Sequence, residues 1–158
     1  MHLGGGNIRA EFVRIDDLPM YNQDLEPDRP DVVDRFTAEI AAADAILMVT
    51  PEHNRSVPAV LKNAIDWGSK PTNKNVWRGK VAAITGTSPG AIGTAVGQQH
   101  LRQILGILGC IVCGGEAYIS FKPELIADNG EITNDDTRAF LRTYLENFIS
   151  LAKKVNGN

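Results

Sequence analysis

The chain has 158 residues, of which 43% are hydrophobic and 22% are charged, and its formal net charge is -3. These values are typical of a single globular domain, 1–158, and they give no electrostatic basis for binding nucleic acid or an anionic membrane surface. No apolar run approaches the length of a membrane span and the N-terminus lacks a signal-peptide core, so we expect a cytoplasmic protein.

The first part of the chain contains one predicted strand and one predicted helix. Residues 1–7 are flexible by composition, since they include a run of glycines. The alternation of side chains in 8–15 predicts a strand near a sheet edge. A loop broken by prolines follows, and the apolar positions of 31–43 share one face of a helix.

The stretch 45–67 predicts a strand, a loop and a helix. The apolar run 45–49 is typical of a strand buried on both faces. Thr50 and Pro51 end this strand, and later apolar positions at helical spacing predict a helix that begins near Pro58. Because ligands of open parallel sheets bind beyond the carboxyl ends of the strands, the polar loop in this stretch lies where a ligand site is expected.

In the second half of the chain, predicted strands again alternate with predicted helices. Residues 80–85 predict a short strand, 86–93 a glycine-rich turn, and the next residues a helix that ends near Leu108. Residues 111–119 predict the last strand, and a capping box that starts at Thr133 predicts the beginning of the final helix. This order predicts an α/β fold, a doubly wound parallel sheet with helices on both faces.

The two cysteines, Cys110 and Cys113, form a C-x-x-C pattern. A redox dithiol or half of a zinc site is one interpretation. Their apolar surroundings and the lack of a second cysteine pair favour the other interpretation, in which both are small buried hydrophobic residues.

The run P-E-H-N-R-S-V-P-A-V-L-K-N-A-I-D-W, residues 51–67, resembles the signature of the NADPH-dependent FMN reductases, which are the flavodoxin-like quinone, chromate and azo reductases. The family usually has tyrosine in place of His53 and glycine in place of Ala59. The run D-L-P-M-Y-N-Q-D-L, residues 17–25, is similar to the segment after the family's second strand. The alternative is an ordinary surface loop before a core-facing helix. The resemblance implies a flavodoxin-like fold.

The family's first strand, its phosphate loop G-S-x-R-x-x-S-x-N and its first helix have no counterpart before Ile8. We therefore expect a single flavodoxin-like domain, 1–158, that is incomplete at its N-terminus and lacks the usual donors for an FMN phosphate. Three explanations stay open. The first residue is an internal methionine of a longer protein, the sequence has lost its beginning, or a short chain is stabilised by its partner.

The resemblance implies that two segments face the flavin. Asn54 and the backbone amides of the first segment would bind the polar edge of the ring, and the imidazole of His53 would lie beside it. In the second, glycines would let the backbone approach the ring, and Thr87 would place a hydroxyl near it. The simpler alternatives are an exposed loop histidine and a plain strand-to-helix turn. The candidate cofactor-binding residues are Pro51, Glu52, His53, Asn54, Ser56, Gly86, Thr87, Ser88, Pro89 and Gly90.

The implied function is an FMN-dependent NAD(P)H oxidoreductase. Its cofactors are FMN and NADPH or NADH, and hydride passes through flavin N5 to a small-molecule electron acceptor such as a quinone, an azo compound, chromate or free flavin. We assign no side chain as a catalytic acid or base and expect no metal, because the cofactor carries the chemistry. Two alternatives stay open: a flavin-free flavodoxin-like interaction or regulatory domain, and an electron-transferring flavodoxin.

The family resemblance also implies a homodimer or homotetramer. The helix of residues 57–67 would lie at the interface, and Glu52 would pair with an arginine of the partner. Arg102 is the candidate for that arginine, and a solvated helix charge is the alternative for it.

Overall fold

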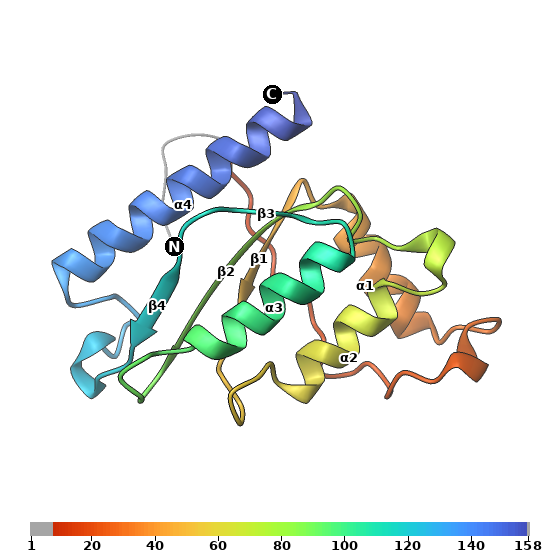
Figure 1. Cartoon of the computed structure of the whole chain (residues 1–158), viewed down its shortest axis with the longest axis horizontal. Coiled ribbons are helices and arrows are strands. Elements are labelled where there is room, and N and C mark those ends of the chain that lie inside the picture. The colour runs from red at the N-terminus through yellow and green to blue at the C-terminus, as the bar shows by residue number, and fades with distance from the viewer. Residues whose placement is uncertain (1–7, 158) are drawn as a thin grey trace.

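The strands of this chain form one parallel sheet. The structure is a computed structural model that describes residues 8–157. Within these residues the strands form a parallel four-stranded sheet in the order β1-β2-β3, with β4 also paired to β2 (Figure 1). The strands are β1 (Ala45–Val49), β2 (Val81–Ser88), β3 (Ile111–Val112) and β4 (Ala117–Ser120).

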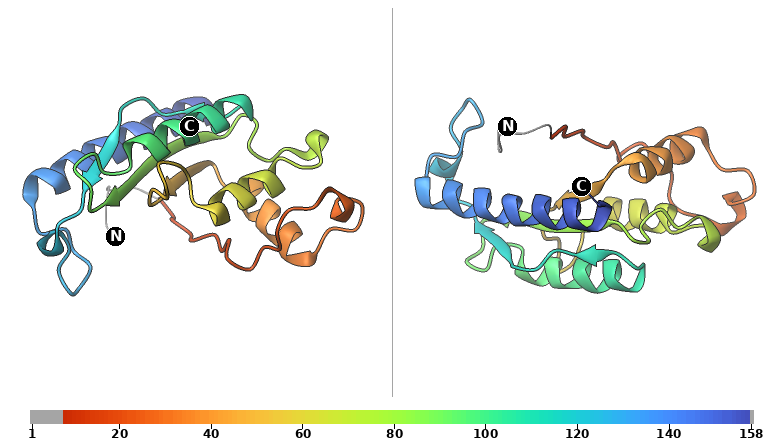
Figure 2. Two further views of the ribbon diagram at one scale, coloured as in Figure 1. Left: turned by 60° about the horizontal axis from the view of Figure 1, so that its bottom comes forward. Right: turned by 90° about the horizontal axis from the view of Figure 1, so that it is seen from above.

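Helices cover both faces of the sheet, as the sequence predicts. On one face, Phe36, Ile65 and Leu101 belong to one apolar core cluster. On the other face, Phe148 and Val81 belong to a second cluster, and Figure 2 shows α3 and α4 on opposite sides of the sheet. The α-helices are α1 (Asp31–Ala42), α2 (Ala59–Gly68), α3 (Ala95–Ile107) and α4 (Asp135–Asn156), and short 3-10 helices span Gln23–Leu25, Thr72–Lys74 and Pro123–Leu125. In the described chain, no helix combines the length and the apolar character that a membrane span requires.

Strand β1 is not buried on both faces, which corrects the sequence interpretation. Met48 is 6% exposed, whereas Leu47 is 39% and Val49 is 69% exposed. Successive side chains of a strand point to opposite faces, so one face of β1 packs on the core and the other faces solvent. Among residues 8–157, β1 pairs only with β2, and this leaves its other edge open.

The prediction of a strand at 8–15 is wrong. Alternation does occur in the second half of this segment, because Val13 and Ile15 pack against the core while Arg14 is exposed. The segment joins no ladder in the described chain, and an extended segment becomes a strand only when a partner takes its N–H and C=O groups. Residues 1–7, for which the composition predicts flexibility, lie outside the described residues.

The predicted strand 111–119 is two strands, β3 and β4, separated by Cys113–Glu116. Gly115 lies in this break with a φ of 84°, which extended β structure does not use. Arg102 of α3 supports the break, because its guanidinium donates hydrogen bonds to the carbonyls of Cys113 and Gly115. Arg102 is therefore bound within its own chain, unlike the solvated helix charge considered above.

The predicted helix boundaries agree closely with the structure, and one cap differs. The helix that begins near Pro58 is α2, whose N-cap is Pro58. The cap of α4 is Asn134, whose side chain accepts a hydrogen bond of 2.7 Å from the Thr137 N–H. The capping box predicted from Thr133 is thus displaced by one residue, since the Thr133 hydroxyl donates instead to the Glu124 carbonyl.

Candidate functional site

The two predicted ligand-facing segments begin side by side at the carboxyl edge of the sheet. The Thr50 N–H donates to the Thr85 carbonyl at 3.0 Å, so the loop after β1 starts beside the end of β2. Gly86 makes this approach possible, because a Cβ at this position would lie 1.9 Å from the Thr50 carbonyl oxygen. A larger residue at position 86 would force the two strand ends apart.

The loop after β1 folds back on itself in a tight turn. The backbones of His53 and Ser56 exchange hydrogen bonds of 3.0 Å and 2.9 Å. Between them, Asn54 and Arg55 have φ angles of 51° and 63°, as both central residues of a type I′ turn do. The turn leaves the side chains of His53 and Asn54 exposed at its tip.

Glu52 points back into its own chain. Its side chain is only 7% exposed, and its carboxylate lies 3.3 Å from the Arg55 guanidinium. The other carboxylate oxygen accepts a 2.8 Å hydrogen bond from the Gly97 N–H in the first turn of α3. The arginine that pairs with Glu52 in this structure thus belongs to the same loop.

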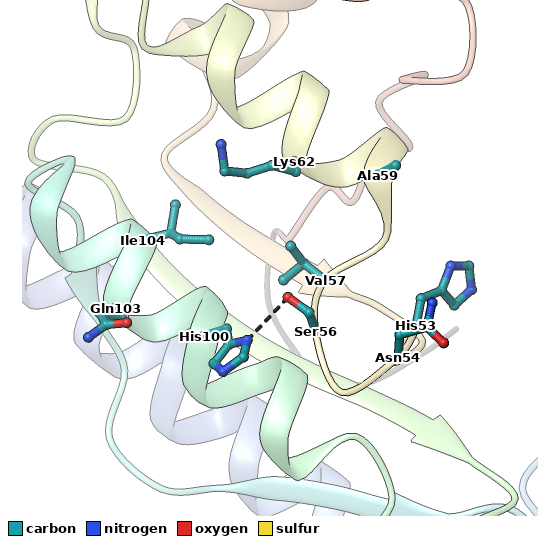
Figure 3. A pocket seen from close by; sticks show the side chains of 9 residues that line it. All are labelled: His53, Asn54, Ser56, Val57, Ala59, Lys62, His100, Gln103 and Ile104. Carbon is teal, nitrogen blue, oxygen red and sulfur yellow. Dashed lines mark hydrogen bonds between the residues drawn. The ribbon is translucent and has the colours of Figure 1, made fainter.

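A hollow separates this turn and α2 from α3. It has a volume of about 620 Å³, and the Nδ1 atom of His100 lies 3.1 Å from the Ser56 hydroxyl across it (Figure 3). Sequence reasoning missed the side chains from α2 and α3; the helical spacing of His100, Gln103 and Ile104 is a signal that could have found a shared face. The residues that line the hollow are His53, Asn54, Ser56, Val57, Ala59, Lys62, His100, Gln103 and Ile104.

The second predicted segment is only partly a turn. Gly86, Thr87 and Ser88 belong to β2, because β4 pairs with this part of the strand. The Ser88 hydroxyl donates to the Gly93 carbonyl at 2.6 Å and is used to close the connection to α3. Pro89 and Gly90 are exposed in that connection.

Thr87 carries a polar group that its own chain leaves unpaired. Its hydroxyl is buried and has no hydrogen-bond partner among the described residues. An unpaired buried hydroxyl costs free energy, which a ligand that offers an acceptor or a donor can recover. The exposed Asn54 amide and the imidazole of His53 are groups that suit the polar edge and the flat face of a flavin ring. The Gly97 N–H in the first turn of α3 is already bound to Glu52 and is not free for a phosphate.

The two cysteines lack the properties of a redox pair. Burial raises the pKa of the Cys110 thiol to about 11 and also raises the pKa of the Cys113 thiol. Neither forms a disulfide, and the Cys110 thiol donates to the Trp77 carbonyl at 3.2 Å. A reactive thiol needs a lowered pKa. Cys113 therefore fits the interpretation as a buried hydrophobic residue, whereas Cys110 is only half-buried.

An open parallel α/β sheet with polar segments at adjoining strand ends is typical of doubly wound α/β proteins, and comparison with known proteins shows that this one is flavodoxin-like and specifies its family. A family model described as NADPH-dependent FMN reductase matches residues 2–124. The chain belongs to the NADPH-dependent FMN reductase family, whose cofactors are FMN and NAD(P)H, and is an oxidoreductase.

Relatives match most of the chain. It is 48% identical over 147 residues to a 2-hydroxy-1,4-benzoquinone reductase of a Burkholderia species, covering 92% of this chain and 80% of the relative. It is 44% identical over 154 residues to a quinone reductase of Pseudomonas putida, covering 96% of this chain and 82% of the relative. The structure of FerB, a flavoenzyme NAD(P)H:(acceptor) oxidoreductase of Paracoccus denitrificans, has a TM-score of 0.86 and 43% identity, covering 90% of this chain and 79% of that one.

Proposed function

We propose that this protein is a quinone reductase that holds FMN at the carboxyl ends of β1 and β2. The observation that supports this site most directly is the contact between Thr50 and Gly86, which brings the 53–56 turn and the 86–90 segment to one edge of the sheet. The names of the relatives from Burkholderia and Pseudomonas putida support a quinone as the acceptor.

Bound FMN would supply the redox chemistry by taking a hydride from NAD(P)H and passing its electrons to the acceptor. The overall reaction converts NAD(P)H, a quinone and a proton into NAD(P)+ and a hydroquinone. The chain's own residues would bind and orient the flavin. Asn54 offers an amide to the polar edge of the ring, Thr87 offers its unpaired hydroxyl, and His53 offers a flat face in place of the tyrosine usual in the family.

We propose a homodimer or homotetramer that forms through α2 and α3. Val60 of α2 and Ile107 of α3 are exposed apolar side chains, and Ile107 is 86% exposed. We propose that a second copy covers these side chains. Size-exclusion chromatography with light scattering tests this proposal, and a monomer at micromolar concentration would contradict it. We also propose a single domain and a cytoplasmic location.

The test of the activity begins with adding FMN to the purified protein and recording its absorbance, its fluorescence and the rate of NADPH oxidation with 1,4-benzoquinone under anaerobic conditions. We expect stoichiometric flavin binding and quinone-dependent oxidation, with azo dyes, chromate and free flavin as comparison acceptors. An Asn54→Ala variant should bind FMN more weakly, by about tenfold. The matched control is Asn73→Ala, which lies beyond the opposite end of α2.

A protein that neither binds FMN nor oxidises NADPH would contradict the proposal. The flavin-free interaction or regulatory domain would then describe this polypeptide better. Flavin binding without any turnover of NADPH would instead favour the electron-transferring flavodoxin.

A further inference from the structure

The turn of residues 53–56 has backbone φ angles that its own residues do not favour. Asn54 and Arg55 both lie in the left-handed region of φ, at 51° and 63°. Asparagine tolerates this region better than most residues, whereas arginine has no local compensation for it. A turn of this kind persists only where the surroundings hold it.

The Glu52 carboxylate is the strongest of the contacts that hold the turn. It accepts a 2.8 Å hydrogen bond from the Gly97 N–H on one oxygen and lies 3.3 Å from Arg55 on the other. The negative charge sits in the first turn of α3, where the helix dipole favours it. The same side chain thus ties the loop to α3 and fixes Arg55 within the turn.

Glycine at position 97 lets the loop and the helix approach closely. A Cβ there would lie 3.1 Å from the Ser56 carbonyl oxygen and 3.3 Å from Glu52 Cγ. The second anchor, between His100 and Ser56, is exposed to solvent and therefore weaker. Glu52 is almost fully buried, so water replaces its hydrogen bond poorly when the carboxylate is removed.

From these contacts we infer that Glu52 is a positioning residue that holds the 53–56 turn against α3, so that His53 and Asn54 present one fixed orientation to the flavin. The inference rests on the proposed function. The resemblance to the family implied a contact across a subunit interface for this carboxylate, whereas the contacts seen here are internal. Glu52 would act through the turn and would itself touch neither the flavin nor the acceptor.

Three variants separate the contributions. Glu52→Ala removes both contacts, and Glu52→Gln keeps an oxygen for the Gly97 N–H but loses the charge. Arg55→Ala removes the ion pair alone. We expect FMN affinity to fall in the order wild type, Arg55→Ala, Glu52→Gln and Glu52→Ala, with a loss of about tenfold or more for Glu52→Ala.

A readout that needs no flavin makes the test decisive. Hydrogen exchange followed by mass spectrometry on the flavin-free protein should show faster exchange of the amides of 53–57 in Glu52→Ala, with 81–85 in β2 unchanged. A Tyr144→Phe variant, which weakens the opposite face of the sheet, controls for a general loss of stability. It should leave FMN affinity near the wild-type value at temperatures well below its Tm.

The outcomes are distinguishable. Faster exchange at 53–57 together with weaker FMN binding and an altered flavin circular dichroism spectrum supports the inference. Unchanged exchange in Glu52→Ala overturns it, and so does faster exchange with wild-type FMN affinity. If the wild-type protein takes up no FMN while Glu52→Ala still loosens the turn, the proposed function is overturned and the anchoring of the turn is supported.

Discussion

The hydroxyl of Tyr144 in α4 bonds both backbone groups of Ile84 in β2. It accepts a 3.1 Å hydrogen bond from the Ile84 N–H and donates a 2.8 Å hydrogen bond to the Ile84 carbonyl. Ile84 lies between the part of β2 that pairs with β3 and the part that pairs with β4. One side chain thus replaces the backbone partner that the break between these strands removes.

Replacing Tyr144 by phenylalanine should therefore destabilise the fold. The change leaves a buried N–H and a buried C=O unpaired, which costs about 2–3 kcal/mol. Urea unfolding followed by circular dichroism measures the loss. Tyr118→Phe is the control, because the Tyr118 hydroxyl bonds the exposed side chain of Gln99 and its removal should cost less than about 1 kcal/mol.

Two substitutions of glycine by alanine should have opposite effects. Gly86→Ala places a methyl group against the Thr50 carbonyl, so we expect a loss of at least about 3 kcal/mol and much weaker FMN binding. Gly106→Ala meets no atom within 4 Å and lies inside α3, so better helix propensity should stabilise the protein by about 0.5–1 kcal/mol. Thermal unfolding of both variants checks the signs. A Gly86→Ala variant as stable as wild type would contradict the close packing of the two strand ends.

Thr87→Val should separate stability from flavin binding. The substitution replaces an unpaired buried hydroxyl by a methyl group of similar size, so the flavin-free protein should gain about 1 kcal/mol of stability. FMN affinity should fall in the same variant if the hydroxyl meets the flavin. A stability measurement without FMN and a fluorescence titration with FMN give the two values. Lower stability of the flavin-free variant would mean that this hydroxyl has a partner within the protein.

The stability of the protein should fall in alkaline solution through Cys110. Burial raises the pKa of this thiol from 9.0 to about 11, so the folded state keeps a proton that the unfolded state releases. The contribution is fully present below pH 9 and is lost as the pH rises from 9 to 11. The free energy of unfolding, measured across this range, should fall more steeply in the wild type than in Cys110→Ala. Equal slopes would contradict the raised pKa.

The local patterns of the chain predict most of its elements. The apolar run of β1 and the helical spacing of α2 appear within short stretches, and the structure confirms both. The remaining features depend on contacts between distant segments. Strand β2 extends to Ser88 because β4 pairs with it, and 8–15 forms no strand because no described segment pairs with it. Alternation within a segment says nothing about whether a partner exists.

The candidate site shows the same division. The loop and its residues could be predicted from the sequence, because 51–67 resembles the family's signature. The type I′ turn, the bond from Glu52 to Gly97 and the unpaired hydroxyl of Thr87 need the packing of α3 and the sheet. His100 lies far from the loop in sequence, and its contact with Ser56 follows from the position of α3 alone.

The raised pKa values of the two thiols have a consequence for an enzyme whose proposed acceptors are electrophiles. Quinones add to thiolates, and a cysteine that ionises near neutral pH would be alkylated by the substrate itself. With a pKa of about 11, Cys110 is thiolate in only about one molecule in ten thousand at pH 7. Cys113 is buried and its pKa is also raised. We therefore expect both thiols to react slowly with the proposed acceptors at neutral pH.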